Sequence, residues 1–316
     1  MHQLTKLLNI QYPIIQGGMG NISNAPLAAA VSEAGGLGTI GVGTMPPEEV
    51  EQILIDIKKL TKKPFAMNIP INVTDFLKEI LTLAIHYQVP VVSLSAGNPA
   101  PFIEKLHEND IKVIAVVASV NHALKAEAAG VDVVVAEGYE AAGINSPYES
   151  TTLTLVPQIV NKVSIPVVAA GGIADGRGLA AMITLGASGV QMGTRFIATK
   201  EAPFHEKYKE TVLYSDDTST VIVGRSVGRI RRLIQAPYTE ILLDLEKKGL
   251  SVEEYLTLTS EDHHKKGALE GNALEGFMNA GQIAGLVEDI PTVKQLIEKM
   301  MGDAKSTLQS STQLFL

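Results

Sequence analysis

Glycine residues recur in this sequence where apolar, β-branched runs end. Two such places carry the clearest chemistry: Gly171-Gly172, which opens the segment GGIADG, and Gly193-Thr194, which follows the run GVQM. Glycine lets a backbone approach a ligand closely, and free N–H groups at the start of a helix bind phosphate. Neither segment has the Gly-Lys-Ser/Thr of a Walker loop or the G-x-G-x-x-G spacing of a dinucleotide site. We therefore expect a single phosphomonoester here, such as FMN or a sugar phosphate.

Two further kinds of side chain could line the same site. Asn68 ends an apolar run in a Met-Asn-Ile-Pro context. An amide at a strand end can pair with the donor and acceptor edge of a flavin ring, although an asparagine here could also simply form a turn. Met19, Met67 and Met192 could pack on such a ring, and filling of the core is their alternative role.

The elements that must position these residues follow from the alternation of short apolar runs with longer amphipathic segments. Such alternation predicts a parallel sheet covered by helices, and near-continuous apolar runs are typical of strands buried on both faces. The expected strands are residues 13–18, 37–41, 65–71, 91–97, 112–119, 131–138, 166–172 and 189–197. Eight strand–helix units favour a (β/α)₈ TIM barrel, whose active site lies at the C-terminal ends of the strands. An open doubly wound sheet is the alternative.

Helix signals and a change of pattern near residue 200 divide the chain. Residues 46–49 (PPEE) open one helix, and residues 121–129 form another between Ser119 and Gly130. We expect a barrel from residues 1–200 and about 290–316, and a helical substrate or lid subdomain over about 201–290. A closing helix is expected at residues 291–301, with a frayed tail after Gly302.

The composition excludes several classes of protein. The 316 residues are 46% hydrophobic and 19% charged, which excludes a disordered chain, and the net charge of -8 disfavours nucleic acid as a partner. The absence of cysteine removes disulfides, thiolate metal sites, iron–sulfur clusters and cysteine nucleophiles. There is no signal-peptide pattern and no apolar run of roughly 20 residues, so we expect a cytoplasmic protein without a membrane partner. No His/Asp/Glu spacing indicates a metal site.

Taken together, these motifs resemble the nitronate monooxygenase family, formerly called 2-nitropropane dioxygenases, which includes enoyl-ACP reductase II. The resemblance spans almost the whole chain. The segments that carry it are residues 12–19, 34–38, 64–69, 136–141, 166–176, 191–196 and 280–286. Residues 96–99 (AGNP) and 280–285 (AGQIAG) look most like the enoyl reductase branch.

The resemblance implies a barrel that binds FMN, with NADH or NADPH as a candidate co-substrate. The flavin ring is expected to meet the first glycines and Asn68, Glu137 to touch the ribityl chain or the ring edge, and the phosphate to lie in the two glycine loops. The implied cofactor-binding residues are Gly17, Gly18, Met19, Asn68, Glu137, Gly143, Gly171, Gly172, Gln191, Met192, Gly193 and Thr194.

One departure from the family bears directly on catalysis. The family's loop reads Glu-Ala-Gly-Gly-His-x-Gly, whereas residues 140–148 read EAAGINSPY. Ile144 stands in place of the family's histidine, and Ala142 in place of a glycine. Asn145 and Ser146 are the candidate catalytic residues that remain in the loop, because both can donate a hydrogen bond to a substrate oxygen; both are poor bases at neutral pH. The other histidines are expected at the surface: His86, His107, His122, His205, His263 and His264.

Three functions follow from this reading. The first is an FMN-dependent oxidoreductase that resembles nitronate monooxygenase without the usual histidine, the second an NAD(P)H-dependent reductase of the enoyl-ACP reductase II type, and the third a flavin-binding protein without efficient turnover. A relative of inosine monophosphate dehydrogenase would need a cysteine and is set aside. The expected partner is a small molecule or an acyl thioester, and a homodimer is left open. Four arginines could bind the phosphates of NAD(P)H or of an acyl carrier, or form a solvated helix face: Arg225, Arg229, Arg231 and Arg232.

Overall fold

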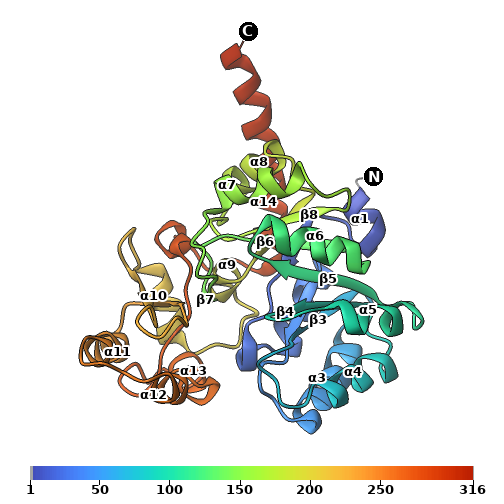
Figure 1. Ribbon diagram of the computed structural model, residues 1–316. Helices are drawn as coiled ribbons and strands as arrows, with labels where there is room; N and C mark the ends of the chain where they lie inside the picture. Colours follow the sequence, from blue (N-terminus) through green and yellow to red (C-terminus); the bar gives the residue numbers. More distant parts are fainter. Residues whose placement is uncertain (1–2, 316) are drawn as a thin grey trace.

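The computed structural model describes residues 3–315 and confirms the TIM barrel. Its main sheet has eight strands in the order β1-β9-β8-β6-β5-β4-β3-β2, and all neighbouring strands are parallel (Figure 1). A parallel bridge between Ile15 and Leu37 joins β1 to β2 and closes the sheet on itself. The strands are β1 (Ile14–Gln16), β2 (Gly38–Gly41), β3 (Phe65–Pro70), β4 (Val91–Ser95), β5 (Lys112–Val117), β6 (Val133–Glu137), β8 (Val167–Ala170) and β9 (Gly189–Met192).

Helices surround the barrel and begin and end where local chemistry dictates. The Ser119 hydroxyl accepts the N–H of His122 at the start of α6, and Gly130 adopts a left-handed φ of 97° at its end, as the sequence predicts. The Asp175 carboxylate caps α8 in the same way, accepting from the N–H groups of Arg177 and Gly178. The helices of the barrel are α1 (Gln3–Leu8), α2 (Ala25–Glu33), α3 (Pro47–Leu60), α4 (Leu77–His86), α5 (Ala100–His107), α6 (Val120–Ala129), α7 (Thr152–Val160) and α8 (Gly176–Thr184).

The interior of the barrel is apolar at its N-terminal end and polar at its C-terminal end. Leu4 and Leu8 of α1 pack with inward-facing residues of the strands, such as Val133 and Val135 of β6. Successive side chains of a strand alternate between its two faces, so Glu137 shares the inward face of Val133 and Val135. By the same alternation Asn68 follows Ala66 along β3 on the inward face. On β3 and β6 the inward polar groups therefore lie toward the pole where the site is expected.

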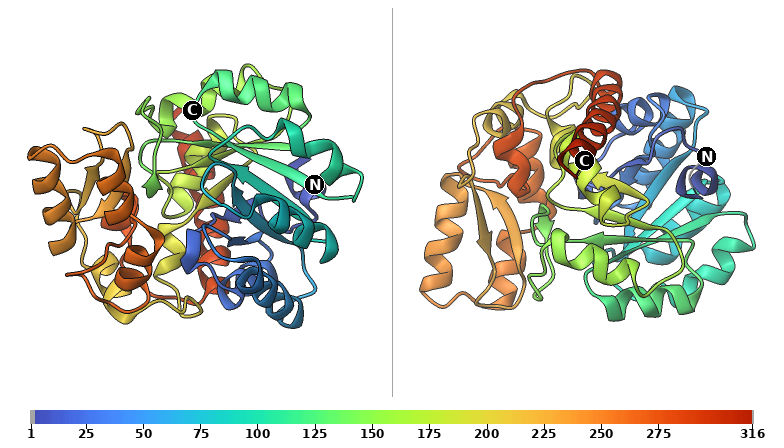
Figure 2. Two further views of the ribbon diagram at one scale, coloured as in Figure 1. Left: turned by 60° about the horizontal axis from the view of Figure 1, so that its bottom comes forward. Right: turned by 90° about the horizontal axis from the view of Figure 1, so that it is seen from above.

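A second unit lies over the C-terminal ends of the strands (Figure 2). We call it the cap. It was expected to be wholly helical, but it contains the hairpin β10 (Thr220–Val223) and β11 (Arg231–Ile234), which pairs with β7 (Gly143–Ile144) from the loop after β6. Gly224 and Gly228 have positive φ angles in the loop of this hairpin, so the basic stretch is a hairpin rather than a helix face. The helices of this region are α9 (Thr194–Ile197), α10 (Glu206–Leu213), α11 (Pro237–Lys247), α12 (Val252–Leu258) and α13 (Glu261–Ala268). Elsewhere along the chain, short 3₁₀ turns lie at Gly20–Ile22 (η1) after β1, at Gln282–Leu286 (η2), and at Gln313–Phe315 (η3) after α14.

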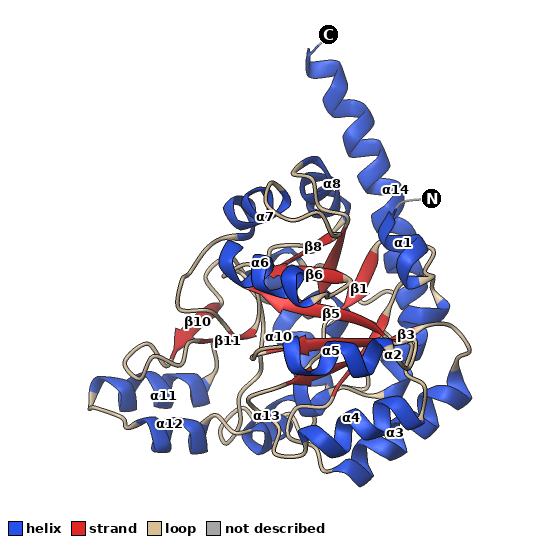
Figure 3. Cartoon of the chain, turned by 45° about the vertical axis from the view of Figure 1, so that its right-hand side comes forward, coloured by secondary structure: helices blue, strands red, loops and turns tan. Residues whose placement is uncertain are grey.

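The closing helix is longer than the sequence predicts. α14 spans Val293–Thr312, so the tail after Gly302 is helical rather than frayed (Figure 3). Its first half packs closely on α8, because a Cβ atom on Gly176 would lie 2.7 Å from the Met300 carbonyl oxygen, and the contact continues to the Cβ of Asp303 at 2.5 Å. Once that docked half is formed, each further residue adds a hydrogen bond without a new nucleation cost, which explains why one glycine does not end the helix. Within residues 3–315, no helix is long and apolar enough to cross a membrane.

A side chain completes the join between β1 and β2. These strands share only the Ile15–Leu37 bridge, and beyond it the buried Gln16 amide takes the place of a peptide group. Its Nε2 donates to the Thr39 carbonyl at 3.0 Å, and its Oε1 accepts from the Thr39 N–H at 3.4 Å. The barrel is thus closed by one backbone bridge and one amide side chain.

Replacing Gln16 with leucine should therefore lower the free energy of unfolding by about 1–3 kcal/mol, because it leaves the N–H and C=O of Thr39 buried without partners. Urea denaturation measures this quantity. The matched control is Gln158→Leu, since the Gln158 side chain on α7 bonds only to the exposed Thr154 carbonyl. It should change the stability by less than about 0.5 kcal/mol. Equal, small effects in both variants would contradict the role given to Gln16.

Candidate functional site

The two glycine loops lie at the ends of neighbouring strands. Gly171 and Gly172 follow β8 with φ angles of 93° and 76°, a left-handed conformation that favours glycine. Gly193 follows β9 as the N-cap of α9, and a Cβ added to it would meet nothing within 4 Å. Loops after the seventh and eighth barrel strands, with the N-terminus of a short extra helix, form the phosphate site of many such barrels. Here β8 and β9 are those strands, α9 is the short helix, and open space lies in front of Gly193.

The glycines after β1 lie against polar side chains of the barrel interior. A Cβ on Gly18 would be 2.6 Å from the Cβ and 2.8 Å from the Oδ1 of Asn68, and a Cβ on Gly17 would be 3.5 Å from the Nε2 of Gln191. The backbone of Gly18 can approach Asn68 only because residue 18 has no side chain, whereas the contact of Gly17 with Gln191 is an ordinary van der Waals distance. Three of the strand ends, β1, β3 and β9, therefore converge at the mouth of the barrel.

Hydrogen bonds to β4 fix the orientation of the Asn68 amide. Its Nδ2 lies 3.3 Å from the Ser93 carbonyl, 3.2 Å from the Ser93 hydroxyl and 3.3 Å from the Ser95 hydroxyl. With the donor group held by β4, Oδ1 lies on the side of Gly18. The amide is therefore a fixed polar group at the mouth rather than part of a turn.

The methionines fall on two sides of the sheet. Met67 and Met192 lie in the core between the strands and the outer helices, so their role is the filling of that core, and the Met192 side chain does not face the mouth. Only the carbonyl of Met192 takes part in this region, where it accepts from the Gly17 N–H. Met19 is half-buried in the loop after β1, and its N–H donates to the Ser23 hydroxyl.

Glu137 is a half-buried acid without a protein partner. It ends β6 on the inward face, and no hydrogen bond or ion pair joins its carboxyl group to another residue in the described part of the chain. Desolvation by the surrounding protein raises its pKa from 4.5 to about 7. Because its hydrogen-bonding capacity is unused, this carboxyl group is suited to a ligand that brings hydroxyl or N–H donors into the mouth.

The loop at residues 140–148 offers little for proton transfer. The Ile144 side chain is 54% exposed in β7 and has no group that can carry a proton. Asn145 is buried, and its Nδ2 donates to the carbonyls of Ala141 and Gly143 at 3.0 and 3.1 Å. The Ser146 hydroxyl accepts from the Tyr148 N–H at 3.3 Å and keeps its own proton to donate. Gly143 has a φ of 73°, and a Cβ there would lie 3.7 Å from the Oδ1 of Asn279.

A buried polar cluster surrounds His264, and the sequence does not predict it. His264 is only 1% exposed, so its expected surface position is wrong. Its Nδ1 lies 3.2 Å from the Oε2 of Glu261, its Nε2 lies 3.0 Å from the Nδ2 of Asn279, and its ring stacks on Phe277. The only signal in the sequence is the Glu-x-x-His spacing of Glu261 and His264. That spacing puts both residues on one face of α13 but does not say which face is buried.

Glu261 also ties the cap to the barrel. Its carboxylate accepts from the Asn21 N–H at 3.2 Å, in the loop after β1. Burial alone would raise the pKa of Glu261, but the hydrogen bond and charge of His264, the charge of Arg231 and the Asn21 N–H hold it at about 2. An ionised carboxylate of the cap therefore holds the loop that follows Gly17 and Gly18.

Two of the four arginines are not free to bind a ligand. Arg231 is buried over the Phe277 ring, and Arg232 is buried with its Nε donating to the Tyr139 carbonyl at 3.1 Å. Arg225 pairs with Glu149 and with the Tyr139 hydroxyl. Of the four, only Arg229 is exposed without a side-chain partner among the described residues.

The segment after α13 is tied to the second glycine loop. The Thr194 hydroxyl accepts from the Gly281 N–H at 2.9 Å. Next to it the buried Arg195 pairs with Asp289 and donates to the Ala198 carbonyl at 3.2 Å. The guanidinium of Arg195 is therefore occupied by Asp289 and the Ala198 carbonyl.

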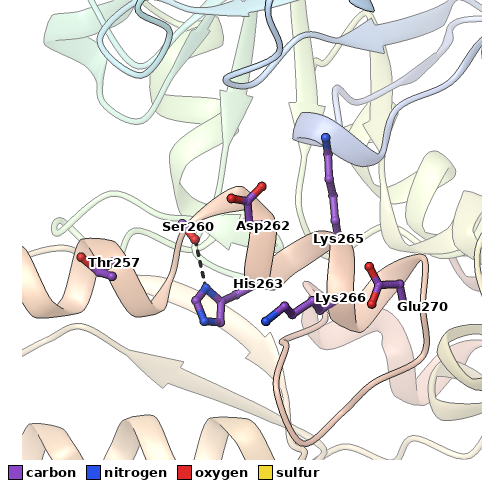
Figure 4. Close-up of a pocket in the computed structure, with 7 residues that line it drawn as sticks. All are labelled: Thr257, Ser260, Asp262, His263, Lys265, Lys266 and Glu270. Carbon is purple, nitrogen blue, oxygen red and sulfur yellow. Dashed lines mark hydrogen bonds between the residues drawn. The ribbon is translucent and has the colours of Figure 1, made fainter.

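A separate pocket on the cap is not part of this site (Figure 4). It is lined by Thr257, Ser260, Asp262, His263, Lys265, Lys266 and Glu270. In Figure 4 the side chains of Asp262 and Lys265 point away from those of His263 and Lys266. Lys265 instead pairs with Glu49 of the barrel at 3.6 Å, so the charged groups do not converge on one ligand. Within residues 3–315, no cluster of His, Asp or Glu could hold a metal ion.

A closed parallel barrel with a polar mouth at the C-terminal ends of its strands defines a TIM-barrel enzyme. Comparisons with known proteins agree. Residues 1–303 match the family model for nitronate monooxygenase, and the chain belongs to that family. It is 36% identical to a probable nitronate monooxygenase of Staphylococcus saprophyticus, over 97% of this chain and 98% of the relative.

Other relatives carry names of different oxidoreductases. The chain is 31% identical to an indene-carboxyl-CoA dehydrogenase of Mycobacterium tuberculosis, over 98% of both proteins. It is similar to the solved structure of FabK from Thermotoga maritima with a TM-score of 0.95 and 40% identity, over 99% of both chains. The protein is therefore an oxidoreductase, and the comparisons support a flavin as its cofactor.

The partnerless Glu137 predicts an unusual pH dependence in the flavin-free protein. Its native carboxyl group keeps a proton up to about pH 7, whereas the unfolded one ionises near 4.5. Between these values the native state binds more protons, so the free energy of unfolding should fall as the pH rises, by a total of about 3 kcal/mol.

Urea denaturation from about pH 4 to about pH 8 should show this fall in the wild type and remove it in Glu137→Gln. The variant should match the wild type at the acid end and exceed it at the alkaline end. The control is Glu79→Gln, an exposed residue on the outer helix α4, which should keep the slope of the wild type. A slope that persists in Glu137→Gln would rule out Glu137 as its source.

Proposed function

We propose that the protein is an FMN-dependent oxidoreductase that takes a hydride from NADH or NADPH and passes it to a small electrophile, with enoyl thioesters as the first acceptors to examine. The observation that carries the proposal is the mouth of the barrel, where two glycine loops, with open space at Gly193, lie at the same pole as a half-buried carboxyl group without a partner. The absence of a dinucleotide fingerprint in these loops favours FMN over a flavin dinucleotide.

The residues at the mouth fit the parts of FMN. The N–H groups of the two glycine loops and the N-terminus of α9 suit the phosphate, and Glu137 suits the ribityl hydroxyls or the ring edge. When bound, FMN supplies a ring that accepts and donates a hydride. The residues that would hold it are Gly17, Gly18, Met19, Asn68, Gln191 and the Met192 backbone around the ring, Glu137 and Gly143 at its edge, and Gly171, Gly172, Gly193 and Thr194 at the phosphate.

Position 144 favours reduction over the oxidation of neutral nitroalkanes. Removing a proton from a nitroalkane needs a base, which is worth about 10²–10⁴-fold in rate. Ile144 supplies none, and both amide hydrogens of Asn145 are used within the loop. Ser146 is the one candidate of the loop with a proton to donate to a substrate oxygen. Hydride transfer from a nicotinamide needs a positioned donor rather than a base.

Oxidation of a preformed nitronate is the second candidate function. The nitronate monooxygenase family model and the Staphylococcus saprophyticus relative favour it. A nitronate is already an anion, so the missing histidine costs this reaction less than it costs nitroalkane oxidation. The third alternative, flavin binding without turnover, is the outcome if neither reagent reduces the bound flavin.

Anaerobic stopped-flow mixing of the flavin-loaded protein with NADH, NADPH or a nitronate tests the proposal. We expect a yellow protein whose flavin is bleached by one nicotinamide nucleotide far faster than free FMN, and reoxidised by a crotonyl thioester. Bleaching by the nitronate alone would favour the second candidate. A colourless protein that takes up no FMN would contradict both.

A further inference from the structure

We propose that Thr152, braced by Glu140, is a positioning residue that turns the peptide between Gly171 and Gly172, so that the site selects a phosphorylated flavin over riboflavin. The inference rests on the proposed FMN site and assigns two residues that lie outside its expected contacts. It concerns the segment at residues 149–152 (ESTT), to which the proposed reaction gives no role.

The Thr152 hydroxyl reaches the end of the strand that carries the first glycine loop. Thr152 is the first residue of α7 and is 1% exposed. Its Oγ1 lies 3.0 Å from the Gly171 carbonyl oxygen, 3.2 Å from the Ala170 carbonyl oxygen and 2.9 Å from the Oε2 of Glu140. All three oxygens are acceptors and the hydroxyl has a single proton, so Thr152 is the donor that these groups share.

The planarity of the peptide bond converts this contact into an orientation. In a trans peptide the C=O and the following N–H point in opposite directions. The Gly171 carbonyl is turned toward Thr152, so the Gly172 N–H points away from it. That N–H donates no hydrogen bond to any residue in the described part of the chain, and Gly172 is exposed. A free, oriented N–H on a left-handed glycine is the donor that a phosphate oxygen needs.

Glu140 braces this arrangement from behind. Both of its carboxylate oxygens lie 3.0 Å from the Thr152 N–H, where an acidic group at the N-terminus of α7 is favourable. Its side chain also backs Gly172, because a Cβ added to that glycine would lie 3.5 Å from the Oε1 of Glu140. The carboxylate therefore holds Thr152 and limits the movement of Gly172.

Glu140 also connects the two glycine loops. The Glu140 carbonyl accepts from the Gln282 N–H at 3.0 Å, and the preceding Gly281 N–H donates to the Thr194 hydroxyl at 2.9 Å. A chain of contacts thus runs from Gly171 through Thr152 and Glu140 to Thr194 at the start of α9. The two halves of the expected phosphate site share one support.

Titration of the flavin-free protein with FMN and with riboflavin, followed by flavin fluorescence, tests the inference. Riboflavin lacks the phosphate but has the same ring and ribityl chain. Thr152→Val removes the hydroxyl and keeps the shape of the side chain, so it should weaken FMN binding about tenfold and change riboflavin binding by less than about twofold. Thr152→Ser keeps the hydroxyl and should restore the wild-type ratio of the two affinities.

The matched control is Thr154→Val on the same helix. The Thr154 hydroxyl is exposed and bonds only to the hydroxyl and carbonyl of Thr151. This variant should leave both affinities unchanged. If the valine variant fails to fold, Thr152→Ala allows the same measurement. Equal weakening of FMN and riboflavin would show a merely structural role and overturn the inference, as would no weakening of either. A wild type that binds neither ligand would overturn the proposed FMN site itself.

Discussion

Parallel pairing around a closed sheet is the constraint on which the rest of this structure depends. Because every strand runs in the same direction, the loops after β1, β3, β6, β8 and β9 must all meet at one pole, however far apart they lie in the sequence. The barrel has the fewest backbone hydrogen bonds between β1 and β2. These strands share a single bridge, and the Gln16 amide makes the hydrogen bonds that a further peptide group would make. The polar mouth exists because inward positions near the ends of β3, β6 and β9 carry Asn68, Glu137 and Gln191 rather than aliphatic residues.

Two largely desolvated carboxyl groups near this pole have opposite pKa shifts because their partners differ. Desolvation without a partner raises the pKa of Glu137 to about 7, and its hydrogen-bonding capacity stays unused. Desolvation would also raise the pKa of Glu261, but the groups around it, foremost His264, hold that pKa at about 2. The charge of Glu261 is already compensated by these groups, and its carboxylate connects the cap to the loop after β1. A carboxyl group with unused hydrogen-bonding capacity is the better candidate for ligand binding than one whose capacity is filled.

The barrel and its glycine loops could be predicted because both leave local marks in the sequence. Apolar runs such as VVVAE of β6 are typical of buried parallel strands, and Ser119 and Gly130 mark the ends of α6. The cap could not be predicted in the same way. β7 has two residues and depends on a partner far along the chain, so no local pattern announces it. The burial of His264 depends on which face of α13 meets the barrel, and the full length of α14 depends on the docking of its first half against α8.

The central claim is that FMN lies at the C-terminal pole of the barrel with its phosphate in the loops after β8 and β9. A crystal structure of the protein soaked with FMN tests it most directly. The account predicts phosphate oxygens within hydrogen-bonding distance of the backbone N–H groups of Gly172 and Thr194, and the ring beside Gly18 and Asn68. A phosphate held instead by the exposed Arg229, or a flavin in the pocket between α12 and α13, would contradict it.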